Sequence, residues 1–202
     1  MPLDLVIASA NPDKAAELRE LLVGELGPAV AIWPRPDYVG EIEETGETLE
    51  ENARLKAETI SRATGLASIA DDTGLEVHAL GGAPGVYSAR YAGEDASYAD
   101  NVSKLLDELV GHDDRSARFR TVCVISFPDG TELVAEGAVD GLIGTEAAGR
   151  SGFGYDPLFR PLADSSRSYA ELSAAEKHEV SHRGLAVRNV ARLLRAKLNG
   201  EN

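Results

Sequence analysis

The sequence contains few of the residues that mark secreted or membrane proteins. Its 202 residues include a single cysteine, Cys123, and no apolar run approaches the roughly 20 residues needed to span a bilayer. One cysteine excludes an internal disulfide framework and fits a reducing compartment. The first residues also lack the basic, apolar and small-residue zones of a signal peptide. We therefore expect a cytoplasmic protein with no membrane partner.

Positive charge is scarce as well. Lysine and arginine number 20 against 34 acidic residues, which gives a net charge of −14 and an isoelectric point near 4.7. Sequence-independent binding to nucleic acid depends on neutralising phosphates, so this balance argues against that class of protein. A small anionic substrate is still compatible with it, because a few basic side chains gathered in one cleft can hold phosphates.

Several catalytic motifs are absent. The sequence has no Cys/His spacing suited to zinc, no Walker-type phosphate loop and no Gly-x-Ser-x-Gly nucleophile elbow. These absences argue against a zinc enzyme, a P-loop nucleotidase and a serine hydrolase of the α/β-hydrolase type.

The chain does contain an alternation of strand and helix patterns. With 43% hydrophobic residues it has the composition of a globular protein, and its length suits one large domain or two small lobes. Short apolar runs predict strands, and capped amphipathic runs predict helices. Strands are expected at 3–9, 29–33, 66–70, 117–127 and 131–139. Helices are expected at 12–23 and 49–64, after a cap at Asp95 or Ser97, after Ser173, and at 185–198.

Two of these helices carry apolar stripes that we expect in the core. The expected stripes are Tyr98, Val102, Leu105, Leu106 and Leu109 in the helix after Asp95 or Ser97, and Val187, Val190, Leu194 and Leu198 in the helix at 185–198. Gly184 is expected to bend the chain before this last helix.

Two adjacent carboxylates, Asp71 and Asp72, follow the apolar run 66–70. A strand that ends there would place them at a sheet edge, where open α/β sheets bind ligands. Paired carboxylates repel unless a cation neutralises them, which favours a hard metal such as Mg²⁺. The alternative is a simple polar turn, because aspartate and glycine are common in turns.

The segment from Ser9 to Lys14 is expected to join a strand to a helix. Asn11 suits the N-cap and Pro12 the first helical position, so the helix would present backbone N–H groups to an anion. Lys14 is unfavourable for the helix dipole there but suits anion binding. Alternatively, Lys14 is an ordinary surface lysine.

Three other places carry candidate chemistry. Asn52 and Lys56 lie four residues apart on one helix face, from which Lys56 either enters a cleft or covers apolar surface. Phe153, in a glycine-rich loop, either stacks on a base or fills the core. His182 and Arg183 either donate hydrogen bonds to a ligand or form an exposed pair at a helix junction.

Taken together, these motifs resemble the inosine triphosphate pyrophosphatase family, in its bacterial dITP/XTP pyrophosphatase form. The match is collinear from Leu5 to about Leu198. The motifs that carry it are Ser9-x-Asn11-x-x-Lys14, Glu43-Glu44-Thr45-Gly46, Glu51-Asn52-Ala53, Lys56-Ala57, Ala70-Asp71-Asp72-Thr73-Gly74-Leu75, the run from Gly81 to Tyr91, Gly152-Phe153-Gly154-Tyr155-Asp156-Pro157 and Ser181-His182-Arg183-Gly184.

The resemblance implies an α/β protein of the Maf/Ham1 type over residues 1–202, with a long mixed sheet flanked by helices and two lobes around a nucleotide cleft. It implies a Mg²⁺-dependent homodimer that hydrolyses ITP, dITP and XTP to the monophosphate and pyrophosphate, which keeps these nucleotides out of DNA and RNA.

Individual roles are carried over by position. The resemblance places Glu44 and Asp72 on Mg²⁺ with Asp71 close by, and makes Asp72 the general base. Thr73 keeps a hydroxyl where many relatives carry serine. The residues implied to bind the triphosphate are Ser9, Ala10, Asn11, Pro12, Asp13 and Lys14, with Lys56 and Lys177 adding positive charge. Those implied to hold the base are Phe153, Gly154, Tyr155, Asp156, His182 and Arg183.

Two alternatives remain open at this point. One is a related Maf-type pyrophosphatase that acts on modified pyrimidine or other nucleotides, and the other is a non-catalytic nucleotide-binding module. A panel of nucleotide substrates distinguishes the Maf-type enzyme from the inosine triphosphate pyrophosphatase hypothesis. Nucleotide binding without turnover would identify the binding module.

Overall fold

The computed structural model describes residues 1–200, which divide into two compact units. Unit 1 contains Met1–Asp72, Thr121–Gly137 and the chain from Arg183 onward, and unit 2 contains Thr73–Arg120 and Ala138–His182. Each unit has its own core of buried apolar side chains. The predicted nucleotide cleft remains a prediction.

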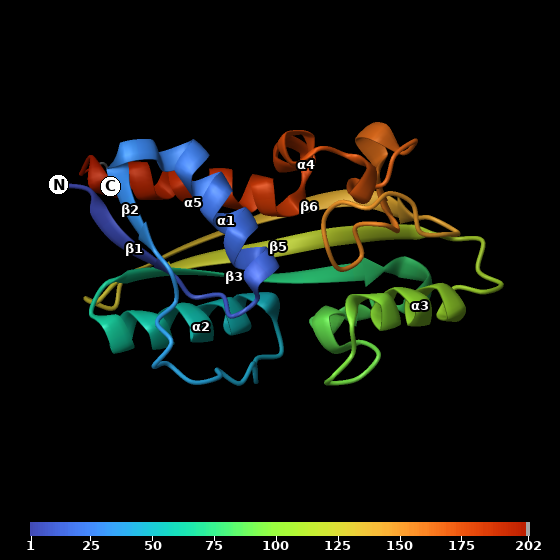
Figure 1. The fold of residues 1–202 in the computed structure, drawn as a ribbon, viewed down its shortest axis with the longest axis horizontal. Helices are drawn as coiled ribbons and strands as arrows, with labels where there is room; N and C mark the ends of the chain where they lie inside the picture. Colours follow the sequence, from blue (N-terminus) through green and yellow to red (C-terminus); the bar gives the residue numbers. More distant parts are fainter. Residues whose placement is uncertain (201–202) are drawn as a thin grey trace. The chain divides into compact units, whose positions relative to one another are not determined.

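Seven strands form a mixed sheet in the order β2-β1-β3-β5-β6-β7, with β4 paired to β3 (Figure 1). β1 pairs in parallel with β2 and β3, whereas β3–β4 and β6–β7 are antiparallel. This confirms the predicted α/β class with a mixed sheet. The strands are β1 (Leu3–Ile7), β2 (Val30–Trp33), β3 (Ala67–Val77), β4 (Pro84–Gly85), β5 (Ser116–Ser126), β6 (Glu132–Ile143) and β7 (Phe159–Pro161).

The predicted caps define most helix starts. Thr48, Ser97 and Ser173 each form a capping box, in which the side chain accepts from the third helical N–H and that residue's acid accepts in return. The helices are α1 (Pro12–Leu26), α2 (Leu49–Thr64), α3 (Tyr98–Glu108), α4 (Ala174–Val180) and α5 (His182–Leu198), with short 3₁₀ turns at Gly27–Ala29, His78–Leu80, Ser88–Arg90, Leu162–Asp164 and Tyr169–Glu171.

In unit 1, helices cover both faces of the strands. Figure 1 shows α1 and α5 on one side of β1 and β3, and α2 on the other. Side chains alternate between the faces of a strand. Ile69 accordingly packs in the core with α1 and α5, while the neighbouring Ser68 hydroxyl donates to the Ala57 carbonyl of α2. The same alternation separates Asp71 from Asp72.

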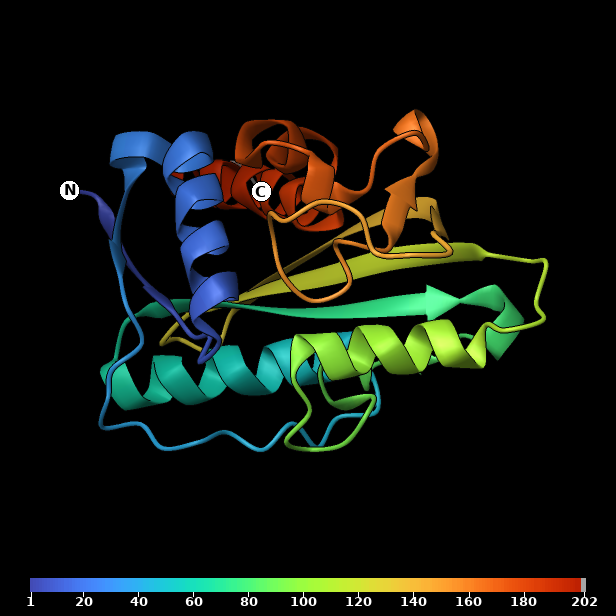
Figure 2. The same ribbon diagram turned by 45° about the vertical axis from the view of Figure 1, so that its right-hand side comes forward.

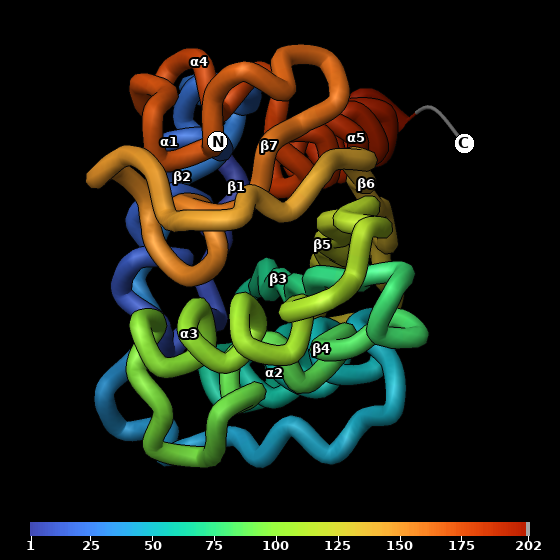
Figure 3. The backbone as a smooth tube through the Cα atoms, turned by 90° about the vertical axis from the view of Figure 1, so that its right-hand side faces the viewer, coloured from blue at the N-terminus to red at the C-terminus, as the bar shows by residue number. Residues whose placement is uncertain are grey.

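Unit 2 has the other core. Leu105 and Leu109 of α3 pack with Leu75 and Val77 of β3, in a cluster that also holds Phe119 of β5. Figures 2 and 3 show α3 on one side of these strands and the orange segment of residues 145–165 on the other. The loop that contains Phe153 still reaches the start of α3, where the rings of Phe153 and Tyr98 lie with their centroids 5.8 Å apart.

Several sequence predictions were wrong. β3 continues through Asp71 and Asp72 instead of ending at Ala70, because basic side chains neutralise both buried carboxylates. α5 starts at His182 and runs through Gly184. Tyr98 and Leu198 lie near helix ends and are 39% and 45% exposed, so neither is a core residue.

Candidate active site

Asp72 is the centre of a buried charged group in unit 1. Lys56 Nζ of α2 donates to Asp72 Oδ1 at 3.0 Å and to Glu44 Oε1 at 2.9 Å, and Lys14 Nζ of α1 lies 3.9 Å from the same Asp72 oxygen. Asp72 and Lys56 are only 4% and 7% exposed. Asp72 Oδ2 is also buried, and it has no hydrogen-bond partner among residues 1–200. Lys56 therefore enters the site instead of covering apolar surface.

Asp71 belongs to a second buried group on the opposite face of β3. Arg183 Nε of α5 donates to Asp71 Oδ2 at 3.0 Å, and Arg183 Nη1 donates to Glu17 Oε2 of α1. The arginine side chain is 2% exposed and the Asp71 side chain 0%. Arg183 is thus held between two carboxylates and is not an exposed residue of a helix junction.

The two aspartates differ in their proton affinity. Burial raises the pKa of Asp72, and Glu44 adds to this rise against the opposing effects of Lys56 and Lys14. Burial acts in the same direction on Asp71, but Arg183 and the two lysines outweigh it and hold the pKa of Asp71 below its ordinary value. Of the two carboxylates, Asp72 therefore has the higher affinity for a proton.

Asn11 is the N-cap of α1, as predicted. Its side-chain oxygen accepts from the N–H groups of Asp13 and Lys14 at 3.0 and 3.1 Å, and Pro12 is the first helical residue. Ser9 Oγ accepts from the Asn11 N–H at 3.3 Å. Two N–H groups that we expected to face an anion therefore bind the cap, so anion affinity at this helix end rests on the Lys14 ammonium group and the helix dipole.

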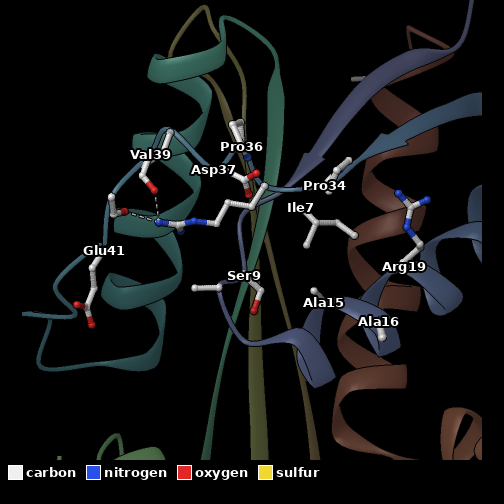
Figure 4. A pocket seen from close by; sticks show the side chains of 13 residues that line it. Ile7, Ser9, Ala15, Ala16, Arg19, Pro34, Pro36, Asp37, Val39 and Glu41 are labelled. Atoms are coloured by element: carbon white, nitrogen blue, oxygen red, sulfur yellow. Dashed lines mark hydrogen bonds between the residues drawn. The ribbon is translucent and has the colours of Figure 1, made fainter.

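A cavity of about 840 Å³ lies beside this segment in unit 1 (Figure 4). Arg35 donates to the carbonyls of Ala8, Val39 and Gly40, which fastens the loop that forms one wall. Ser9 and Ala10 line this cavity, whereas Lys14 and Asp72 are not among its lining residues. Its lining residues are Ile7, Ser9, Ala10, Ala15, Ala16, Arg19, Pro34, Arg35, Pro36, Asp37, Val39, Gly40 and Glu41.

In unit 2, Asp156 holds the Phe153 turn. Its Oδ2 accepts from the Phe153 N–H at 2.8 Å and from Lys177 Nζ at 2.7 Å. A Cβ on Gly152 would lie 2.1 Å from this oxygen, and the φ of +73° also favours glycine there. The Phe153 ring is half-buried and lies outside the core cluster, with Lys177 Nζ 4.9 Å from its centroid. The ring is therefore not simple core filling.

His182 lies in an aromatic cluster of unit 2. Its ring stacks on Phe119 with centroids 4.3 Å apart and planes at 24°, and Tyr169 lies 6.1 Å away. Tyr155 is a buried core residue whose hydroxyl donates to the Ser88 carbonyl. His182 is thus positioned by aromatic packing in unit 2, whereas the next residue, Arg183, belongs to the ion pairs of unit 1.

The comparisons with known proteins agree with this chemistry. A family model described as the Ham1 family matches residues 5–193. The chain belongs to the Ham1 family. A Ham1 protein of Coxiella burnetii has a solved structure that is 41% identical, with a TM-score of 0.84 over 95% of this chain and 98% of that one.

Curated relatives of this Ham1 chain carry an enzyme name. The dITP/XTP pyrophosphatase of Bacillus licheniformis is 48% identical over 95% of this chain and 97% of the relative. The dITP/XTP pyrophosphatase of Streptococcus agalactiae is 53% identical over 92% of this chain, which spans only 58% of that relative's length.

Three residues of these clusters, Glu17, Phe119 and Tyr169, were not predicted from the sequence. Glu17 lies four residues before Leu21, on the buried stripe of α1, and a carboxylate in such a stripe signals a buried partner. Phe119 gave no signal, because an aromatic residue in an apolar strand resembles any core residue.

Two kinds of feature are absent from residues 1–200. They contain no group of three or more His, Cys, Asp or Glu side chains placed to hold a metal ion. In this part of the chain, none of the helices has the length and apolar character to cross a membrane.

Proposed function

We propose that this chain hydrolyses non-standard purine triphosphates such as ITP, dITP and XTP to the nucleoside monophosphate and pyrophosphate. The observation that carries the proposal is Asp72, a buried carboxylate with a raised pKa and two lysines beside it, one of whose oxygens has no hydrogen-bond partner among residues 1–200. The dITP/XTP pyrophosphatase names of the curated relatives support the choice of substrate.

In this proposal Asp72 is the general base. It takes a proton from water as the water oxygen attacks the α-phosphorus, the bond to the bridging oxygen breaks, and pyrophosphate leaves. A raised pKa suits this role because a base works best near the pH at which it operates. Lys14 and Lys56 would neutralise charge on the polyphosphate, which is the main requirement of phosphoryl transfer.

Glu44 and Asp72 fit a magnesium ion. Lys56 Nζ bonds to both within 3.0 Å, so both carboxylates reach one common cation, and the unpartnered Asp72 Oδ2 is a spare oxygen donor. Two carboxylates with water and phosphate oxygens are the usual ligand set of Mg²⁺. Bound there, Mg²⁺ would neutralise phosphate charge and lower the pKa of water. We assign no metal contact to Asp71, because Arg183 binds it on the other face of β3.

In unit 2, we propose that the half-buried ring of Phe153 stacks on the purine and that His182 hydrogen-bonds to its 6-keto oxygen. In adenine the 6-position carries an amino group, which is itself a hydrogen-bond donor, so the His182 donor would have no acceptor there. An unpaired buried donor costs about 1–3 kcal/mol, which disfavours ATP. Arg183 would act indirectly: its ion pairs anchor the first turn of α5, in which His182 lies.

The resemblance to dITP/XTP pyrophosphatases also leads us to propose a cytoplasmic homodimer. Light scattering on the purified protein measures the oligomeric state. A monomer at working concentration would contradict the homodimer without affecting the proposed reaction.

Phosphorus NMR of ITP treated with the protein tests the reaction directly. We expect pyrophosphate and IMP from the wild type, and at least a hundredfold slower release from Asp72→Asn, since general-base catalysis contributes about 10²–10⁴-fold. Asp4→Asn is the matched control, because Asp4 is an exposed acid of unit 1 whose side chain accepts from the Trp33 indole. Orthophosphate as the first product, or an unaffected Asp72→Asn variant, would refute the proposal.

A further inference from the structure

Asn52 is a fully buried polar residue of α2. It is 0% exposed and lies four residues before Lys56 on the same buried helix face. Its Oδ1 accepts from the Gly46 N–H at 2.8 Å. Its Nδ2 is buried and has no hydrogen-bond partner among residues 1–200. A buried amide left in this state costs about 1–3 kcal/mol, so a partner from outside the chain is expected.

The protein contains a second asparagine of the same design, which shows what a purely structural amide does. Asn101 of α3 is 2% exposed and holds a loop of unit 2. Its Oδ1 accepts from the Ala92 N–H at 2.7 Å, and its Nδ2 donates to the Ala89 carbonyl at 3.0 Å. In Asn101 both the amide oxygen and the amide nitrogen bond to the loop, whereas in Asn52 the oxygen does so and the nitrogen has no partner among residues 1–200.

The loop that Asn52 holds carries Glu44. A Cβ on Gly46 would lie 2.7 Å from Asn52 Oδ1 and 2.6 Å from Glu51 Cβ, so only glycine allows this close approach. Glu51 in turn accepts from the Thr48 N–H. The start of α2 therefore fixes the chain two residues beyond Glu44, the carboxylate that meets Lys56 Nζ.

We infer that Asn52 is a further ligand-binding residue, whose Oδ1 holds the Glu44 segment while its Nδ2 donates to an oxygen of the bound polyphosphate. The inference rests on the proposed function, because that function supplies the polyphosphate. The amide is neutral and lies on the same helix face as Lys56. It would therefore add directional recognition to the charge that the lysines provide.

Calorimetric titration with the α,β-imido analogue of ITP, in the presence of Mg²⁺, tests this inference without turnover. We expect Asn52→Ala to raise the Kd by roughly tenfold or more, from the loss of one buried hydrogen bond. Asn101→Ala is the matched control, since it removes an equally buried loop clamp and should lower the melting temperature without changing the Kd. Equal Kd values for wild type and Asn52→Ala would overturn the inference.

Asn52→Asp separates the two ends of the amide. Its carboxylate still accepts from Gly46, so the melting temperature should stay closer to the wild type than that of Asn52→Ala, but it has no N–H to donate and should bind the analogue weakly. A titration of the variant with Mg²⁺ alone measures the effect of the added negative charge on the cation site. We expect its affinity for Mg²⁺ to be no weaker than that of the wild type. Wild-type affinity of Asn52→Asp for the analogue would overturn the donor role. If the wild type itself does not bind the analogue, the proposed function fails instead.

Discussion

Replacing Arg183 with methionine should destabilise the protein far more than a surface change does. The guanidinium group is 2% exposed, and the side chains of its partners Asp71 and Glu17 are 0% and 9% exposed. Removing one partner of a buried ion pair costs about 3–5 kcal/mol, because it leaves uncompensated charge in the interior. A domain of this kind is stable by about 5–15 kcal/mol, so the variant folds with a much smaller margin.

Urea unfolding of the two proteins measures this cost. At an m-value of about 2 kcal/mol/M, the expected loss lowers the unfolding midpoint by about 2 M. Arg195→Met on the same helix is the control, since the side chain of Arg195 is 47% exposed and its pair with Glu25 should contribute about 0–1 kcal/mol. Equal midpoints for Arg183→Met and Arg195→Met would refute the reasoning.

The cost should also depend on pH with a defined sign. In the wild type the pKa of Asp71 is lowered, so its ion pair stabilises the fold above the ordinary aspartate pKa, and that stability is lost as the pH falls. Without Arg183, burial acts with less opposition and the folded-state pKa of Asp71 rises from this lowered value, so the carboxylate contributes less stability as the pH increases. The difference in unfolding free energy between the two proteins should be largest near pH 7 and narrow as the pH falls below the pKa that Asp71 has in the folded variant. A difference that does not change with pH would show that lost packing, not charge, is the cause.

Two further predictions concern the proposed reaction. Lys56→Met should slow pyrophosphate release at least about tenfold. It should also move the acid limb of the pH profile of kcat to higher pH, because Lys56 lowers the pKa of Asp72 and its loss lets that pKa rise. An acid limb that stays at the wild-type pH would exclude this coupling between Lys56 and Asp72. His182→Ala should reduce the ratio of kcat/KM for ITP over ATP by about tenfold, since the loss of one buried donor is worth about 1–3 kcal/mol; an unchanged ratio would remove His182 from base recognition.

Local signals in the sequence predicted most elements of the fold. Thr48 and Gly65 bracket α2, which runs over Leu49–Thr64 as expected, because a capping box and a left-handed glycine act within one helical turn. Asn11 and Pro12 defined the start of α1 in the same way. The family resemblance, carried by motifs along nearly the whole chain, is confirmed by the Ham1 match.

The sequence pattern did not reveal which basic side chains pair with the buried carboxylates. Asp71 and Asp72 look like the polar end of a strand, and only the structure shows that they lie within β3. The partner of Asp71 is Arg183, 112 positions away, and no local pattern encodes such a distant pairing. The split between His182 and Arg183 has the same origin. Adjacent residues at a helix start point in different directions, so one packs on Phe119 while the other binds carboxylates.

Pyrophosphate release from ITP, dITP, XTP, ATP and GTP, each with and without Mg²⁺, tests the proposed function most directly. We expect strong release from the first three substrates only, and only with the metal present. Release from ATP or GTP at a comparable rate, or no release from any of the five, would contradict it.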